Sequence, residues 1–239
     1  MARVGRGLGW TLLVAGAVVL LYVVYLQWFT GLETARAQDE LREQWELAVP
    51  DRTQELTIED RAQEQDEEEP AGEEEVEVVN ALAALWFERD GEPILTDDVQ
   101  YVVDGVSWEA LKNGPGHYPL SDLPGGAGNV AIAGHRGPYG GPFYALDRLR
   151  EGDTIHVIDR EGREWVYAYR EQRIVEPTDL WVVGDDPLGT GAPTITLTSC
   201  HPIGSDAERL IAFGELLDEP LPSMARSTDP VEIATTEIG

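Results

Sequence analysis

Residues 194–202 read TITLTSCHP and carry the only cysteine of the 239-residue chain. Polar and apolar side chains alternate from Thr194 to Thr198, which predicts a β-strand. Pro202 has no backbone N–H and cannot continue a central strand, so we expect pairing to end there. The thiol of Cys200 is therefore expected at a strand end, where a rigid sheet often presents reactive groups. Taken by itself, a lone cysteine is more often a small buried hydrophobe.

Two further reactive side chains stand at predicted strand ends. The run NVAIA at residues 129–133 is followed by Gly134 and then by His135. Nine residues after the cysteine, Arg209 opens the apolar run Leu210–Phe213. An antiparallel return would place this guanidinium beside Cys200, where it could lower the thiol pKa or donate to an oxyanion. Considered singly, the histidine is more often structural and the arginine could equally form a surface ion pair.

The chain after Ala81 consists of short β-type runs separated by Gly, Pro and Asp clusters, which is typical of an all-β barrel or sandwich. Helices are expected only from the Ser107 cap to Lys112 and over Phe143–Leu149. The expected strands are Gln100–Val103, Asn129–Ala133, Thr154–Asp159, Trp165–Val175, Leu180–Val183, Thr194–Thr198 and Leu210–Leu217.

These blocks together resemble the sortase family, and class E sortases of Gram-positive actinobacteria in particular. The resemblance rests on a strand ending TLTSC, a strand ending GHR, and an arginine that opens the next strand. It covers about Val102 to Leu217 and implies a closed, sortase-like β-barrel of about eight strands with short helices, over residues 81–218. Further blocks stand in family order: VDGV at 103–106, GPGHY at 114–118, PG at 124–125, GN at 128–129 and GD at 152–153.

The resemblance implies a cysteine transpeptidase. Cys200 matches the family nucleophile, His135 the acid and base, and Arg209 the group that holds the oxyanion or a substrate carbonyl. The expected substrates are secreted proteins with a C-terminal LAxTG- or LPxTG-like sorting signal, cleaved between Thr and Gly through a thioacyl enzyme. The expected acceptor is an amine of the peptidoglycan precursor, or of a pilin if the enzyme polymerises pilins.

Three more residues are candidate substrate contacts. Tyr139 matches a tyrosine of class E enzymes that is associated with a preference for LAxTG over LPxTG, although it could also be a packing aromatic. Thr198 lies two residues before Cys200, hence on the same strand face. His117, in GPGHY, is expected near the site as a substrate contact or as a structural residue.

Residues 8–29 carry no charge over about the 20 residues that span a bilayer core. We predict a transmembrane helix with residues 1–7 in the cytoplasm, because Arg3 and Arg6 precede it. The protein would be a single-pass type II protein of the cell membrane with an extracellular catalytic domain. A signal peptide cleaved near Ala35–Ala37 is the alternative, but its apolar run would be only about 7 to 15 residues.

Acidic side chains dominate the following segment. The formal net charge is −28, and eighteen acidic and four basic side chains lie between Glu33 and Glu77. This balance excludes a nucleic-acid partner, which requires a basic face. We expect residues 30–80 to be an extracellular linker, largely disordered apart from a short helix over Asp39–Leu47, and residues 219–239 to be a disordered tail.

Several alternatives remain open at this point. A cysteine hydrolase would release the thioester to water, and a non-enzymatic tethered module would keep the thiol buried. A pilin-polymerising sortase typically has an Asp-Pro-aromatic lid motif, and neither Asp-Pro pair of this chain is followed by an aromatic residue. A metal site would use Cys200, His201, His135 and His117. It is disfavoured because these residues lack the paired spacings, such as CxxC or HxxxH, that are usual in zinc sites.

No cofactor is expected. Calcium dependence is left open, because four acidic side chains follow the predicted strand that ends at Val175, although they fit solvated loop charges better. These are Glu176, Asp179, Asp185 and Asp186.

Overall fold

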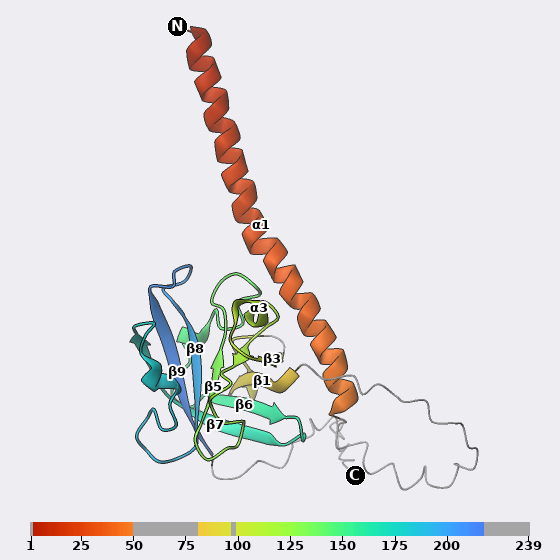
Figure 1. Cartoon of the computed structure of the whole chain (residues 1–239), viewed down its shortest axis with the longest axis vertical. Coiled ribbons are helices and arrows are strands. Elements are labelled where there is room, and N and C mark those ends of the chain that lie inside the picture. Colours follow the sequence, from red (N-terminus) through yellow and green to blue (C-terminus); the bar gives the residue numbers. More distant parts are fainter. Residues whose placement is uncertain (1, 50–80, 97–98, 218–239) are drawn as a thin grey trace, which may run out of the picture.

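The computed structural model describes residues 2–49, 81–96 and 99–217, with the backbone alone for residues 2–9 and 23–30. It consists of a β-barrel and a long helix, α1 (Ala2–Ala48), whose second half lies against the barrel (Figure 1). The strands are β1 (Ala81–Arg89), β2 (Glu92–Pro93), β3 (Gln100–Asp104), β4 (Gly116–His117), β5 (Asn129–Ala133), β6 (Thr154–Asp159), β7 (Glu164–Val175), β8 (Thr194–His201) and β9 (Glu208–Leu216). The short helices are α3 (Trp108–Leu111), η2 (Leu146–Arg148) and η3 (Leu180–Val183).

Eight of the strands close into a ring in the order β1-β3-β4-β5-β8-β9-β7-β6, because β6 pairs back onto β1. Strand β2 only extends the end of β1 as a short hairpin. Two pairings are parallel, β3 with β4 and β5 with β8, and the others in the ring are antiparallel. The predicted all-β closed barrel of about eight strands is therefore confirmed.

The barrel interior is filled by aliphatic and aromatic side chains from all the long strands. Burying a side chain of this size contributes roughly 1.5–3 kcal/mol, so these positions dominate the stability of the fold. The largest fully buried members include Leu85, Phe87, Ile132, Ile155, Tyr167 and Leu197.

Strand β8 is buried on both faces from Thr194 to Ser199. Its polar side chains remain satisfied because neighbouring β5 and the loop after it supply acceptors. Thr194 and Thr196 both donate to Asn129 Oδ1, at 3.1 and 2.9 Å, and Ser199 Oγ donates to Gly134 O at 2.7 Å. The end of β8 that carries Cys200 is thus held firmly against the end of β5.

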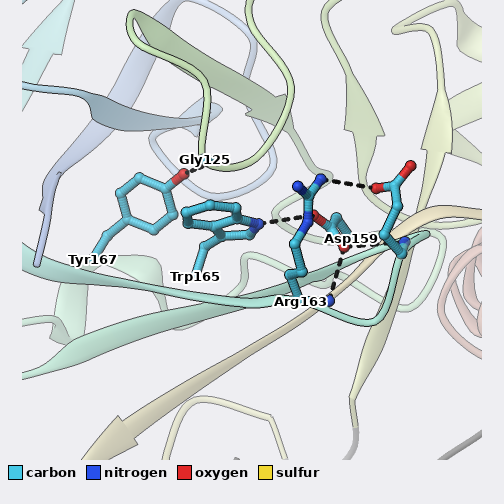
Figure 2. Close-up of polar contacts among 6 residues, drawn as sticks. Gly125, Asp159, Arg163, Trp165 and Tyr167 are labelled. Carbon is cyan, nitrogen blue, oxygen red and sulfur yellow. Dashed lines mark hydrogen bonds and ion pairs between the residues drawn. The ribbon is translucent and has the colours of Figure 1, made fainter. Parts of the chain in front are cut away.

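The hairpin of β6 and β7 fixes the loop between β4 and β5, as Figure 2 shows. Tyr167 Oη accepts a hydrogen bond from Gly125 N at 3.0 Å, and Trp165 Nε1 donates to Asp159 Oδ2 at 2.9 Å. Burial raises the pKa of Tyr167 to about 12, so its phenol is neutral at physiological pH. Gly125 has φ +75°, and a Cβ there would overlap the Trp165 indole, so only glycine fits this contact.

Several sequence-based assignments differ from the structure. The strand expected over Leu180–Val183 is wrong, because these residues form the 3-10 helix η3. A four-residue apolar run has no periodicity that separates the two conformations. Strand β1 was not anticipated, because its first residues, Ala81–Leu85, are rich in alanine, which has low β propensity.

The two expected short helices were placed correctly to different degrees. Helix α3 begins after Ser107, whose Oγ accepts from Ala110 N at 3.1 Å, as the sequence predicted. Only Leu146–Arg148 of the segment expected to be helical over Phe143–Leu149 forms a helix, and it is a 3-10 turn.

Helix α1 corrects the expectation for the start of the acidic linker. It continues to Ala48 instead of ending before a disordered segment at residue 30, and it includes the short helix expected over Asp39–Leu47. Leu41 and Trp45, one turn apart on this otherwise polar stretch, are buried against β1 and β3. Gln38 Nε2 also donates to Tyr101 O at 2.9 Å. The acidic composition concealed this apolar stripe.

No helix within the described residues is long and apolar enough to cross a membrane. The transmembrane span predicted over residues 8–29 includes residues whose side chains the structure does not describe, and it stays a prediction. Most of the predicted linker, residues 50–80, and the tail, residues 219–239, also lie outside the described residues.

Candidate functional site

Three adjacent strands bring the predicted reactive residues to one end of the barrel. In the antiparallel pair of β8 and β9, Cys200 and Arg209 are direct partners. Side chains of directly opposed residues project from the same face of a sheet, so the thiol and the guanidinium are neighbours. Cys200 is partly exposed, which leaves its sulfur accessible.

His135 reaches the same place from β5. The parallel register of β5 and β8 pairs Ala133 with Thr198, and the bond from Gly134 N to Thr198 O, 3.0 Å, extends this pairing by one residue. Two residues beyond each member of this pair are His135 and Cys200. The register therefore brings His135 and Cys200 to the same end of two neighbouring strands.

The imidazole of His135 is buried among aromatic rings. Its centroid lies 5.4 Å from that of Trp108 and 5.2 Å from that of Tyr139, and the Trp108 and Tyr139 rings are themselves 5.4 Å apart. Burial lowers the pKa of His135, which favours the neutral ring that can accept a proton. Its Nε2 is buried and has no hydrogen-bond partner among the described residues.

Arg209 is oriented by the loop between β8 and β9. Its Nη1 donates to Asp206 O at 2.8 Å and to Glu208 O at 3.0 Å. The residue also lines a small pocket, of about 50 Å³, whose opposite wall is formed by residues 175–183. A charged donor beside a thiol and at the edge of a pocket can stabilise negative charge on a bound carbonyl oxygen.

The other predicted contacts divide into two that reach the site and one that does not. Thr198 lines the same pocket, and its Oγ1 lies 3.0 Å from Tyr118 Oη. Tyr139 contacts the ring of His135. His117, in contrast, is buried in β4, where Nε2 lies 2.9 Å from Asp122 O and supports the following loop. The structure does not bring His117 to the pocket.

Trp108 and Arg136 were not among the predicted site residues, and His201 had been considered only as a metal ligand. Trp108 stands at the start of α3 and covers His135, and its only signal was an exposed aromatic residue after a helix cap. Arg136 and His201 directly follow the histidine and the cysteine and contact each other, Nη1 to Nδ1, at 3.0 Å. Their adjacency to the two reactive residues was the available signal.

Metal ligation does not explain this arrangement within the part of the chain that the structure describes. No three His, Cys, Asp or Glu side chains gather there in a way that could hold an ion. The chemistry supported by the geometry is nucleophilic: a thiol, a neutral imidazole that can take its proton, and a guanidinium that can stabilise an oxyanion.

Comparisons with known proteins point to one family. A sequence profile described as Sortase domain matches residues 95–217, just over half of the chain. Sortase SrtE2 of Streptomyces coelicolor is 27% identical over 230 residues, which cover 88% of this chain and 81% of that protein.

Solved structures agree with this match. Sortase E from Streptomyces avermitilis gives a TM-score of 0.50 at 32% identity, covering 58% of this chain and 88% of that one. Sortase E1 from Streptomyces coelicolor, solved with a tripeptide in the active site, gives a TM-score of 0.50 at 26% identity, covering 59% of this chain and 90% of that one. The chain therefore belongs to the sortase family of cysteine transpeptidases, with similarity to the sortase E enzymes of Streptomyces.

Proposed function

We propose that this sortase cleaves a C-terminal LAxTG- or LPxTG-like sorting signal between Thr and Gly and transfers the new carboxyl end to an amine. The observation that carries the proposal is the meeting of His135, Cys200 and Arg209 at one end of β5, β8 and β9. Each side chain has the chemistry that one part of the reaction requires.

In the first half-reaction, neutral His135 takes the proton of Cys200 and the thiolate attacks the threonine carbonyl carbon. Arg209 stabilises the resulting oxyanion. His135 then donates its proton to the nitrogen of the leaving glycine, the C–N bond breaks, and a thioester to Cys200 remains. The lowered pKa of His135 fits this role, since the ring must begin neutral and release its proton readily.

In the second half-reaction, the acceptor amine attacks the thioester carbonyl. His135 removes a proton from the attacking nitrogen, a new amide bond forms, and Cys200 leaves as a thiolate that recovers a proton from the histidine. The net change is the exchange of one amide bond for another. We propose an amine of a peptidoglycan precursor as the acceptor.

The pocket beside Arg209 supports recognition of an extended peptide. Thr198 and Ile211 line it together with residues of the segment from Val175 to Val183. The ring of Tyr139, which contacts His135, is proposed to favour alanine over proline at the second position of the motif. The tripeptide bound in the active site of sortase E1 from Streptomyces coelicolor is consistent with a peptide substrate.

Membrane attachment is part of the proposal, with residues 8–29 as the anchor, the barrel outside the cell, and secreted proteins as substrates. The apolar composition of this segment supports it. Fractionation of cells that express the full chain tests it: the protein is expected in the membrane fraction and resistant to extraction by carbonate. Release by carbonate would contradict the anchor without affecting the chemistry.

Mass spectrometry of the purified full chain tests the nucleophile. Incubation with an LAxTG peptide should add the mass of the peptide up to its threonine to the fragment that contains Cys200. An LPxTG peptide should form less of this adduct. Cys200→Ala should abolish the adduct, whereas Ser205→Ala, in the following loop, should retain it. An adduct that survives in Cys200→Ala would contradict the assignment.

Product analysis separates transpeptidation from hydrolysis. With an added short glycine peptide as acceptor, the expected main product is the ligated peptide, and its yield should rise with acceptor concentration. Release of the acid alone at every acceptor concentration would indicate that water is the physiological acceptor.

A further inference from the structure

The residue after His135 is an arginine with an unusually enclosed charge. The side chain of Arg136 is only 3% exposed. A buried guanidinium is costly unless its donors are paired, so its partners identify what it holds together. Nη1 contacts His201 Nδ1 at 3.0 Å, Nη2 contacts Asp147 Oδ1 at 3.0 Å, and Nε donates to Tyr144 O at 3.4 Å.

The contact with His201 joins the two halves of the site. Arg136 directly follows His135, and His201 directly follows Cys200, so their hydrogen bond lies one residue beyond the reacting pair. Arginine can only donate, so His201 Nδ1 must present its lone pair and the neutral ring must carry its proton on Nε2. The bond from Gly134 N to Thr198 O joins the same two strands on the other side of the pair. The pair is therefore connected from both sides.

The contacts with Asp147 and Tyr144 close the loop that follows His135. These two residues lie in and before η2, and Phe143 N also donates to His135 O at 3.1 Å. The loop from residue 136 to residue 147, which carries Tyr139, is thereby tied at both ends to the site. Asp147 is half exposed, so solvent screens its ion pair, whereas the contact between Arg136 and His201 is partly buried.

We propose that Arg136 is a positioning residue, which through His201 holds the imidazole of His135 in line with the thiol of Cys200. This inference rests on the proposed roles of His135 and Cys200. Proton transfer between them depends on alignment, and a displacement of about 1 Å at a catalytic pair costs roughly 10²-fold in rate. Arg136 is almost fully buried and does not line the pocket beside Arg209, so its effect is expected on the rate of the chemical step.

The first test is Arg136→Gln, measured as single-turnover acylation of the full chain by an LAxTG peptide. The shorter amide cannot reach all three partners, and the acylation rate at saturating peptide should fall roughly 10- to 100-fold. The peptide concentration that gives half the maximal acylation rate should stay within about twofold, because Arg136 does not line the pocket beside Arg209. Arg170→Gln is the matched control: it removes a half-exposed arginine paired with Glu215, and the rate should not change.

The second test keeps the inference falsifiable if Arg136→Gln fails to fold. In His201→Asn, the amide oxygen stands close to the position of Nδ1 and can accept from Arg136, whereas His201→Leu offers no acceptor. His201→Asn is expected to acylate at least fivefold faster than His201→Leu. Equal rates for the two variants, or a wild-type rate in folded Arg136→Gln, would overturn the inference alone. Failure of the unmodified chain to acylate at all would overturn the proposed function, and this inference with it.

Discussion

The histidine of the site has a pKa below its ordinary value of 6.5 because it is buried. At pH values between the pKa of His135 in the folded chain and its pKa in the unfolded chain, the unfolded chain binds more protons than the folded one. The free energy of unfolding must therefore fall as pH decreases through this range. His135→Asn removes this contribution. Urea denaturation between pH 5 and 7.5 should show a smaller loss of stability toward acid in the variant. Parallel stability curves for the two proteins would contradict the assigned pKa shift.

The indole of Trp108 contributes to this burial, because it packs edge-on against the His135 ring. Trp108→Ala should therefore hydrate the imidazole and raise its pKa toward 6.5, and Trp108→Phe should preserve most of the shift. NMR titration of the His135 ring proton measures both. An unchanged pKa in Trp108→Ala would mean that the barrel alone desolvates the ring.

At the level of elements, the contact between the β6–β7 hairpin and the β4–β5 loop depends on a glycine. Gly125→Ala should destabilise the fold by about 2–3 kcal/mol, because it combines backbone strain with overlap on Trp165. Gly91 has a similar φ of +79° but open space around it, so Gly91→Ala should cost only about 1 kcal/mol. Denaturant unfolding compares the two. An equal loss would show that the hairpin yields to the added methyl group.

Strands with alternating side chains and clear stop signals could be predicted from sequence, since β5 and β6 have the predicted bounds. His135, Cys200 and Arg209 were predicted from motifs at strand ends, and the barrel register brings these strand ends to one place. Other features depend on tertiary contacts that no local pattern encodes. Trp108 contacts the ring of His135, which lies in a different segment of the chain. The conformation of Leu180–Val183 is decided by packing of Val182 near Phe213.

On the scale of the whole molecule, the second half of α1 is part of the folded domain. Leu41→Ala should lower the free energy of unfolding by about 2 kcal/mol, because the side chain is buried against the barrel. Leu47→Ala, on the same helix but 81% exposed, should change it by less than about 0.5 kcal/mol. Denaturant unfolding followed by tryptophan fluorescence measures both. Equal effects would indicate that the helix does not stabilise the barrel.

The unbroken course of α1 also fixes a direction. An α-helix turns about 100° per residue, so one residue inserted between Gly31 and Thr34 would rotate the N-terminal half by that angle relative to the barrel. Seven inserted residues, nearly two full turns, would almost restore the original orientation about the helix axis and would lengthen the helix by about 10 Å. The number of helical residues between residue 30 and the barrel therefore sets the direction in which Cys200 faces relative to residues 2–30.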